Sequence, residues 1–314
     1  MIIINKIQVL SFLVLLLSTL KAQEIFKPLP TQIQYDVEKV NLGRELFFEP
    51  LLSKNKKISC SSCHNQYGAD KLKFSFGDDN KLGNINTTTV FNSTYNLSFF
   101  WNGRVSSLKE QLLDGPIYNN HEMNSSKNLI LKRLNESQKY RKLFKTVYNR
   151  NPNFEDVIDS IVAFEKTLIT PNSKFDRYLR NEIKLNKDEK KGFDLFNSYG
   201  CVSCHNGINI GGNSYQKFGT IIDYKSSDDQ KLWTDRFAYT KMPKDKDVYR
   251  VPSLRNVVKT SPYFHSGDIR ELKDAISLMA YYNLGIMLEE KELQLIEAFL
   301  NTLTGDLPKT WIKK

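Results

Sequence analysis

The four cysteines of this 314-residue chain form two copies of one short motif, at residues 60–64 and 201–205. Each copy is Cys-x-x-Cys followed directly by His, the attachment signature of a c-type haem. Two thiols one helical turn apart can add to the two vinyl groups of one haem, and the adjacent imidazole can then reach the iron. The sequence therefore predicts two covalently bound haem c groups, with His64 and His205 as iron ligands and with Cys60, Cys63, Cys201 and Cys204 as the attachment residues.

Three other uses of paired cysteines compete with haem attachment. The pairs could form two disulfides, join in one all-cysteine zinc site, or act as thioredoxin-type redox centres. None of these requires a histidine after both second cysteines, and the chain has only four histidines. The repeated histidine therefore favours haem.

The two motifs lie in similar surroundings. Gly-Arg-Glu-Leu-Phe at 43–47 precedes the first motif, and Gly-Phe-Asp-Leu-Phe at 192–196 precedes the second, which suggests two related haem-binding units. Helical spacing of apolar residues follows Phe154 and recurs from 293 to 303, where Gly305 would end a helix. Asn186 with Glu189 resembles a capping box.

Long strand patterns are absent, and two polar stretches, 70–98 and 206–229, are typical of loops. We therefore expect an all-α fold of two cytochrome c-like haem domains with long irregular loops. The predicted domains are an N-terminal haem domain at 23–180 and a C-terminal haem domain at 181–314, whose last residues can pack on the first domain.

An apolar run from Val9 to Leu20 follows Lys6, as in a signal peptide over 1–22 that is cleaved near Ala22. A membrane anchor is the alternative, although the run is short for a span. Export predicts a periplasmic protein. The net charge of +10 comes from basic residues interspersed with acidic ones, a pattern that argues against nucleic acid as a partner.

Many short segments resemble the bacterial dihaem cytochrome c peroxidase family, which also includes MauG-like maturases. The similarity covers nearly all of the chain after the signal peptide. The matching positions are 42–48, 59–64, 100–104, 111, 115–116, 122–123, 175–179, 251–256 and 261–265.

This resemblance implies different roles for the two haems. The C-terminal haem would receive electrons, with a methionine as its second axial ligand. Met279 lies at the matching position, 14 residues after His265, and a thioether there favours ferrous iron and closes the haem to peroxide. Tyr281 and Tyr282 are the alternative ligands, and His265 is expected to form hydrogen bonds near this haem.

The N-terminal haem would be the peroxidatic one. The resemblance implies Glu122 as the acid/base and Gln111 as the polar guide for peroxide, with Trp101 supporting electron transfer between the haems. Such a reaction needs an open iron and a group that moves a proton between the two oxygens.

A calcium site at the domain interface is also implied by the resemblance. Asn86, Thr260 and Pro262 match its ligands, which would be one side-chain oxygen and two main-chain carbonyls.

Two departures from the family pattern concern the peroxidatic site. Many members cap the resting peroxidatic iron with a loop histidine, but none lies between 65 and 120, so we expect an open or water-bound iron. The segment between Gln111 and Glu122 is one residue longer than the family pattern. Counting from Gln111 by that pattern would therefore place the glutamate at the position of His121. His121 is therefore an alternative iron ligand or proton shuttle.

The implied function is a periplasmic dihaem cytochrome c peroxidase that reduces hydrogen peroxide to water. Its electrons would come from a small cytochrome c or copper protein, and a homodimer is expected. A MauG-like maturase is the alternative enzyme, although Met279 argues against the tyrosine ligand of that class. The non-enzymatic alternative is an electron carrier in which both haem irons are fully ligated and closed to peroxide.

Overall fold

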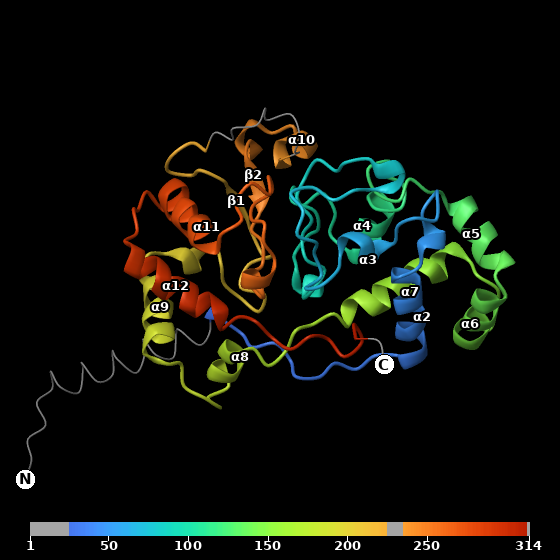
Figure 1. The fold of residues 1–314 in the computed structure, drawn as a ribbon, viewed down its shortest axis with the longest axis horizontal. Helices are drawn as coiled ribbons and strands as arrows, with labels where there is room; N and C mark the ends of the chain where they lie inside the picture. The colour runs from blue at the N-terminus through green and yellow to red at the C-terminus, as the bar shows by residue number, and fades with distance from the viewer. Residues whose placement is uncertain (1–24, 225–234, 313–314) are drawn as a thin grey trace, which may run out of the picture.

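The computed structural model describes residues 25–224 and 235–312, which form two lobes (Figure 1). The predicted signal peptide at 1–22 lies outside the described residues, as do positions 225–229 of the second predicted loop. Within the described ranges, no helix is both long enough and apolar enough to cross a bilayer.

The first lobe is built on two helices that lie side by side, α2 (Val37–Phe47) and α7 (Phe154–Lys166). The side chain of Asn153 caps α7, so the helix predicted from Phe154 is confirmed. Around this pair lie the haem-motif turn and three further helices, α3 (Cys60–Cys63), α4 (Leu108–Asp114), α5 (Lys127–Glu136) and α6 (Gln138–Tyr148).

The second lobe repeats this arrangement with α9 (Lys187–Ser198) packed along α12 (Glu290–Asn301). Asn186 and Glu189 form the predicted capping box of α9. The remaining helices are α8 (Lys174–Leu179), α10 (Arg236–Thr240) and α11 (Leu272–Met279), which continues into a π-helical turn at Ala280–Leu284.

The end predicted for α12 at Gly305 is wrong, because the helix ends at Asn301 with Thr302 as its C-cap. Gly305 serves tertiary packing instead. A Cβ atom on it would lie 2.0 Å from the carbonyl oxygen of Thr170, so only glycine permits this approach.

The glycines of the repeated pentapeptides explain the similarity between the lobes. A Cβ atom on Gly43 would lie 1.8 Å from the carbonyl oxygen of Ser160 on α7. A Cβ atom on Gly192 would lie 1.8 Å from the carbonyl oxygen of Leu295 on α12. In both lobes the missing side chain lets the helix before the haem motif contact the backbone of a later helix.

The all-α expectation holds for the bulk of the fold, which is mainly helical, but one small sheet is present. Strands β1 (Tyr215–Lys217) and β2 (Val248–Arg250) pair antiparallel, with Tyr215 opposite Arg250. The loop prediction for 206–229 is therefore wrong over β1, which lies inside that stretch. The first predicted loop contains 3-10 turns at Asp78–Asn80 and Ser93–Tyr95, and further 3-10 turns lie at Pro50–Leu52, Cys201–Ser203, Pro243–Asp245 and Val257–Lys259.

The two ends of the described chain cross between the lobes. Trp311 packs in the first lobe, where its ring stacks on Phe164 with centroids 6.4 Å apart. Phe26 packs in the second lobe, 5.5 Å from Phe175 of α8. Helix α8 ends at Leu179 and packs with the second lobe. The side chains therefore pack in the second lobe already before residue 180. The boundary predicted at that residue stays a prediction.

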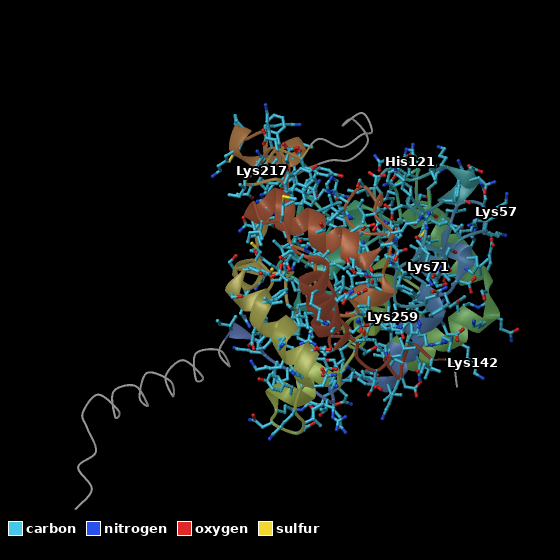
Figure 2. The ribbon with its side chains drawn as sticks, turned by 60° about the vertical axis from the view of Figure 1, so that its left-hand side comes forward. Lys57, Lys71, His121, Lys142, Lys217 and Lys259 are labelled. Carbon is cyan, nitrogen blue, oxygen red and sulfur yellow. The ribbon has the colours of Figure 1, made fainter. Side chains whose placement is uncertain are left out.

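Lysines are distributed over the surface of both lobes, as the labelled ones in Figure 2 illustrate. Many basic side chains have an acidic neighbour, and Lys39 with Asp159 and Lys174 with Glu189 are examples.

Candidate functional site

The first motif folds as a single helical turn, α3, that begins after Ser59. Ser59 and Ser62 form a reciprocal capping box, and the His64 amide donates to the Cys60 carbonyl at 2.9 Å. One turn of helix places Cys60 and Cys63 on the same side. Both thiols are free, as attachment to a haem requires.

His64 is oriented by its own backbone segment. Its Nδ1 lies 2.9 Å from the Gly68 carbonyl oxygen, so Nδ1 carries the proton and Nε2 keeps a lone pair for a metal. Burial lowers the pKa of His64, which favours the neutral form that binds iron. The donor set of this motif fits a c-type haem.

The second motif forms a 3-10 turn, Cys201–Ser203, with His205 buried behind it. Burial lowers the pKa of His205 to about 4. Its Nδ1 is buried and has no hydrogen-bond partner among the described residues. Both cysteines are again free thiols, and no group of acidic, cysteine or histidine side chains in the described parts of the chain could hold a metal ion. The disulfide and all-cysteine zinc alternatives therefore have no support.

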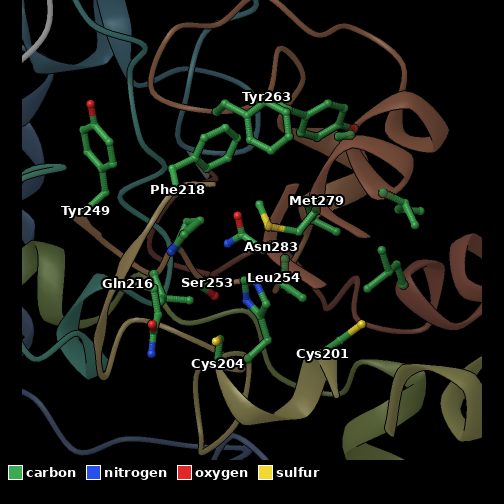
Figure 3. A pocket seen from close by; sticks show the side chains of 18 of the residues that line it. Cys201, Cys204, Gln216, Phe218, Tyr249, Ser253, Leu254, Tyr263, Met279 and Asn283 are labelled. Carbon is green, nitrogen blue, oxygen red and sulfur yellow. The ribbon is translucent and has the colours of Figure 1, made fainter. Parts of the chain in front are cut away.

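A mostly apolar cavity of about 230 Å³ separates the second motif from α11. Cys201, Cys204 and His205 line it, and the Met279 side chain reaches into the cavity from the side opposite Cys201 and Cys204 (Figure 3). Met279 ends α11 where the π-helical turn begins, a local irregularity that often accompanies functional sites. This donor set fits a haem with a histidine and a thioether as ligands.

The tyrosines considered as alternatives to Met279 do not line this cavity in the described structure. Tyr281 is 40% exposed. Tyr282 packs edge-on against Tyr224, with ring centroids 5.0 Å apart.

The same cavity brings together residues from both lobes. Asn86 and Trp101 line it beside Thr260 and Pro262. The Asn86 side-chain nitrogen donates to the carbonyls of residues 72 and 73, at 3.2 and 3.3 Å. This orientation leaves the amide oxygen for another partner. Neutral oxygen ligands of this kind suit a hard cation.

Trp101 is held by the backbone of the predicted calcium ligand. Its Nε1 donates to the Asn86 carbonyl at 2.8 Å. The buried His265 ring stacks on Tyr249 at a centroid distance of 4.1 Å and lies 6.1 Å from the Trp101 ring. His265 therefore contributes to an aromatic group on the cavity wall.

Glu122 lies beside the first motif on the turn after α4. It is partly buried, and its carboxylate accepts a hydrogen bond from the Asn119 side chain at 3.0 Å. Desolvation raises the pKa of Glu122, while that hydrogen bond and the charge of Arg104 oppose the rise. The carboxylate also acts electrostatically on both thiols of the motif, Cys60 and Cys63.

His121 faces outward, although it directly precedes Glu122. Its side chain is exposed, and Nδ1 lies 2.8 Å from the Leu82 carbonyl oxygen (Figure 2). Gln111 lies on α4 and is partly buried. The geometry thus favours Glu122 over His121 as the group that faces the first motif.

A neighbouring loop fixes the backbone of Glu122. The Asp78 amide donates to the Glu122 carbonyl at 2.6 Å. A Cβ atom on Gly77 would lie 2.0 Å from the His121 carbonyl oxygen and 2.7 Å from the Glu122 nitrogen. Glycine at this position therefore allows the loop to hold the turn that carries the carboxylate.

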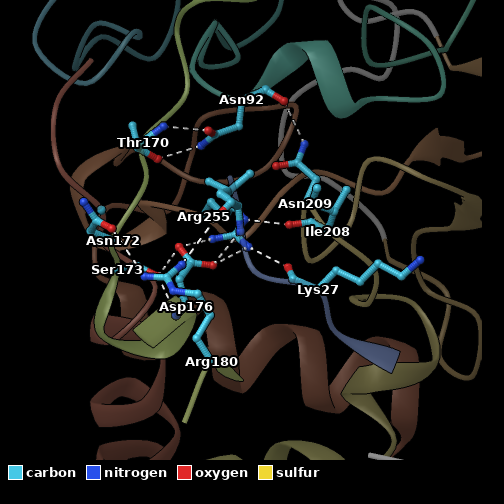
Figure 4. A network of polar contacts seen from close by, with 12 residues as sticks. Lys27, Asn92, Thr170, Asn172, Ser173, Asp176, Arg180, Ile208, Asn209 and Arg255 are labelled. Atoms are coloured by element: carbon cyan, nitrogen blue, oxygen red, sulfur yellow. Dashed lines mark hydrogen bonds and ion pairs between the residues drawn. The ribbon is translucent and has the colours of Figure 1, made fainter. Parts of the chain in front are cut away.

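Sequence reasoning missed four buried ionisable residues. Arg255 and Asp176 occur in segments that carried the family resemblance, and they bind each other within a network of polar contacts (Figure 4). Arg250 lines the cavity, and Glu165 is buried on α7. No local pattern marks any of them, because the packing partners come from distant segments.

Comparison with known proteins agrees with this geometry. Residues 37–184 match the family described as di-haem cytochrome c peroxidase. The cytochrome c551 peroxidase of Nitrosomonas europaea is 41% identical over 91% of this chain and 86% of its own length. The cytochrome c551 peroxidase of Pseudomonas aeruginosa is 39% identical over 92% of this chain and 87% of its own length.

The chain therefore belongs to the dihaem cytochrome c peroxidase family, as an enzyme of the cytochrome-c peroxidase class with two haem cofactors. A solved MauG-like protein associated with microbial copper homeostasis has a similar fold, with a TM-score of 0.78 and 25% identity. That likeness covers 91% of this chain and 95% of the other.

Proposed function

We propose that this protein reduces hydrogen peroxide to water in the periplasm, with electrons from a small redox protein. The reaction consumes one peroxide, two electrons and two protons and yields two waters. The observation that supports this function most directly is the difference between the surroundings of the two motifs. A thioether, Met279, faces the second motif across a cavity, whereas a carboxylate, Glu122, lies beside the first.

Each motif would attach one haem through two thioether bonds, from Cys60 and Cys63 and from Cys201 and Cys204. When bound, the haem irons supply one-electron redox chemistry and an open coordination position for peroxide. His64 and His205 would ligate through Nε2. Met279 would close the second iron, which suits electron entry there.

The protein's own contribution to the chemistry is proton transfer and orientation. The Glu122 carboxylate would take a proton from one peroxide oxygen and return it to the other, which leaves as water. Asn119 holds that carboxylate in place at 3.0 Å. Gln111, on the adjacent helix, would orient the peroxide by hydrogen bonding.

Trp101 is proposed as the route for electrons between the two sites. Its ring is buried in the wall of the cavity that carries the second motif. The hydrogen bond from Nε1 to Asn86 fixes the ring in one orientation. A rigid aromatic group at this junction keeps the electron path constant between turnovers.

Calcium is proposed as a bridge between the lobes, bound by Asn86, Thr260 and Pro262. The orientation of the Asn86 amide supports this, because its oxygen is left for a ligand. Metal analysis of the purified protein before and after chelator treatment tests the proposal. A protein that contains no calcium, and whose activity calcium does not change, would overturn it.

The electron donor would dock beside Met279, where apolar side chains are exposed. Met287 is 84% exposed and Ile221 is 62% exposed. The Ile221 amide donates to the Tyr282 carbonyl at 3.1 Å, which joins this surface to the π-helical turn. Small apolar contacts of this kind suit a transient redox encounter with a cytochrome or copper protein.

Export to the periplasm and a homodimeric state are further parts of the proposal. The apolar run at 9–20 supports export. Fractionation of expressing cells and N-terminal sequencing test the location. Sedimentation equilibrium of the mature protein tests the dimer, and a protein of monomer mass at micromolar concentration would contradict it.

The primary test is an electron paramagnetic resonance spectrum of the oxidised protein, repeated after one equivalent of hydrogen peroxide. A high-spin ferric signal that disappears with peroxide, together with peroxidase turnover, is the expected result. Two low-spin signals that peroxide leaves unchanged would instead indicate a plain electron carrier. A low, tyrosinate-type potential of the second haem would indicate a maturase.

A further inference from the structure

Arg250 is a buried cation in the wall of the cavity that carries the second motif. It lies at the end of β2, is only 4% exposed, and lines the same cavity as Cys204 and His205. Arginine is almost never buried to this extent unless an anion pairs with it.

In the described structure, Arg250 has no carboxylate partner. Its Nε donates to the Phe100 carbonyl at 3.3 Å. Among the described residues, Tyr215 acts electrostatically on its charge, and the Tyr215 hydroxyl donates to Ser98 at 2.7 Å. By contrast, the buried Arg255 is paired with Asp176 at 3.0 Å.

A buried guanidinium without a counter-ion is strongly unfavourable. Burial lowers the pKa of Arg250 to about 10, so the side chain remains charged at neutral pH. No carboxylate of the described residues supplies the compensating anion, whereas the group that fills the cavity can supply it. A haem attached at Cys201 and Cys204 carries two propionate carboxylates, and carboxylates match the fork of a guanidinium.

We propose that Arg250 binds a propionate carboxylate of the haem at the second motif and thereby joins that haem to the Trp101 segment. The inference rests on the proposed haem attachment. The link to Trp101 is direct, because the Arg250 amide donates to the Trp101 carbonyl at 2.7 Å. One residue thus contacts both the second haem and the proposed electron route.

This arrangement has an electrochemical consequence. A fixed positive charge beside the haem stabilises the ferrous form, which carries one positive charge less than the ferric form. Removing that charge leaves the propionate uncompensated, so the reduction potential of the second haem falls. The hydrogen bond from the amide of residue 250 to the Trp101 carbonyl is a backbone contact, so a side-chain substitution leaves it in place and changes the charge alone.

The test compares Arg250→Gln, Arg250→Lys and the wild-type holoenzyme by spectroelectrochemical titration. Haem content is measured first, by the pyridine haemochrome assay and by the mass of the intact protein. We expect Arg250→Gln to lower the potential of the second haem and to leave that of the first unchanged. Arg250→Lys, which keeps the charge, should restore most of the wild-type value.

Arg177→Gln is the matched control, because it removes an arginine whose ion pair with Glu182 is about half exposed. Its two potentials should equal those of the wild type. If Arg250→Gln does not retain haem, Arg250→Lys carries the test, and a large fall in its potential would contradict the inference.

Failure of this inference differs from failure of the proposed function. Two covalent haems with an unchanged second potential in Arg250→Gln would overturn the role of Arg250 alone. Absence of haem from Cys201 and Cys204 in the wild type would overturn both. A wild-type potential that shifts when chloride is exchanged for a larger anion would assign the partner to a free ion, and this too would overturn the inference.

Discussion

Arg255 and Asp176 form a fully buried ion pair, with both Asp176 oxygens within 3.1 Å of the guanidinium. Asp176 also accepts hydrogen bonds from the Leu29 amide and the Ser173 hydroxyl. Arg255 donates to the Ile208 carbonyl at 2.7 Å. The pair therefore joins the N-terminal segment, α8 and the loop after the second motif (Figure 4).

Replacement of Asp176 by Asn should strongly destabilise the second lobe. It leaves the Arg255 charge buried without a partner, which costs about 3–5 kcal/mol. Denaturant unfolding of the holoenzyme, followed by circular dichroism, measures the effect. Asp159→Asn is the control, since the exposed Lys39–Asp159 pair contributes less than about 1 kcal/mol. Equal losses in the two variants would contradict a special role for the buried pair.

Glu165 should make the protein less stable as the pH rises. One of its carboxylate oxygens is buried without a partner, and burial raises its pKa from 4.5 to about 8. Above pH 4.5 the unfolded chain ionises while the folded chain stays protonated, so stability falls by about 1.4 kcal/mol per pH unit until pH 8. Below pH 4.5 both states are protonated and the penalty disappears.

Glu165→Gln should therefore raise the melting temperature at pH 8 more than at pH 5. Glu155→Gln on the same helix removes an exposed carboxylate beside Lys127 and should show no such gain. A Glu165→Gln effect that is equal at both pH values would disprove the buried, protonated state.

Glu122→Gln should lower peroxide turnover by about 10²–10⁴-fold, the usual contribution of acid–base catalysis. His121→Gln should change turnover less than twofold, because His121 binds the Leu82 carbonyl at the surface. Stopped-flow reaction with peroxide measures both variants at equal haem content. A larger loss of turnover in His121→Gln than in Glu122→Gln would show that His121, and not Glu122, is the acid/base group.

The pH dependence of turnover supplies a second check on Glu122. Desolvation raises the pKa of this carboxyl above its ordinary 4.5. Since the ionised form accepts the proton, activity should fall as the pH falls through that raised value. The acid limb should disappear in Glu122→Gln.

Gly77→Ala should reduce turnover without loss of haem. The added Cβ would lie 2.0 Å from the His121 carbonyl oxygen, so the backbone of the Glu122 turn must move. A displacement of about 1 Å at a catalytic group can cost about 100-fold. Gly83→Ala is the control in the same loop, where the nearest atom would be 3.1 Å away. Wild-type turnover in Gly77→Ala would show that the turn is not constrained by this contact.

Local chemistry accounts for what could be predicted from the sequence. Haem attachment depends on two thiols and an imidazole within five residues, so the spacing alone indicates it. The capping box of α9 likewise depends only on Asn186 and Glu189. The repeated glycines marked two related units because each one allows the same close helix contact.

Tertiary structure decided every feature that depends on distant partners. The loop at 77–82 distinguishes the neighbours His121 and Glu122. It binds the His121 side chain at the surface through the Leu82 carbonyl, and it holds the Glu122 backbone through the Asp78 amide. Asn86 meets Thr260 only where the lobes face each other. Arg255 and Asp176 are 79 positions apart. Whether a charge is buried, and what compensates it, follows from packing between segments, and no pattern along the chain encodes that packing locally.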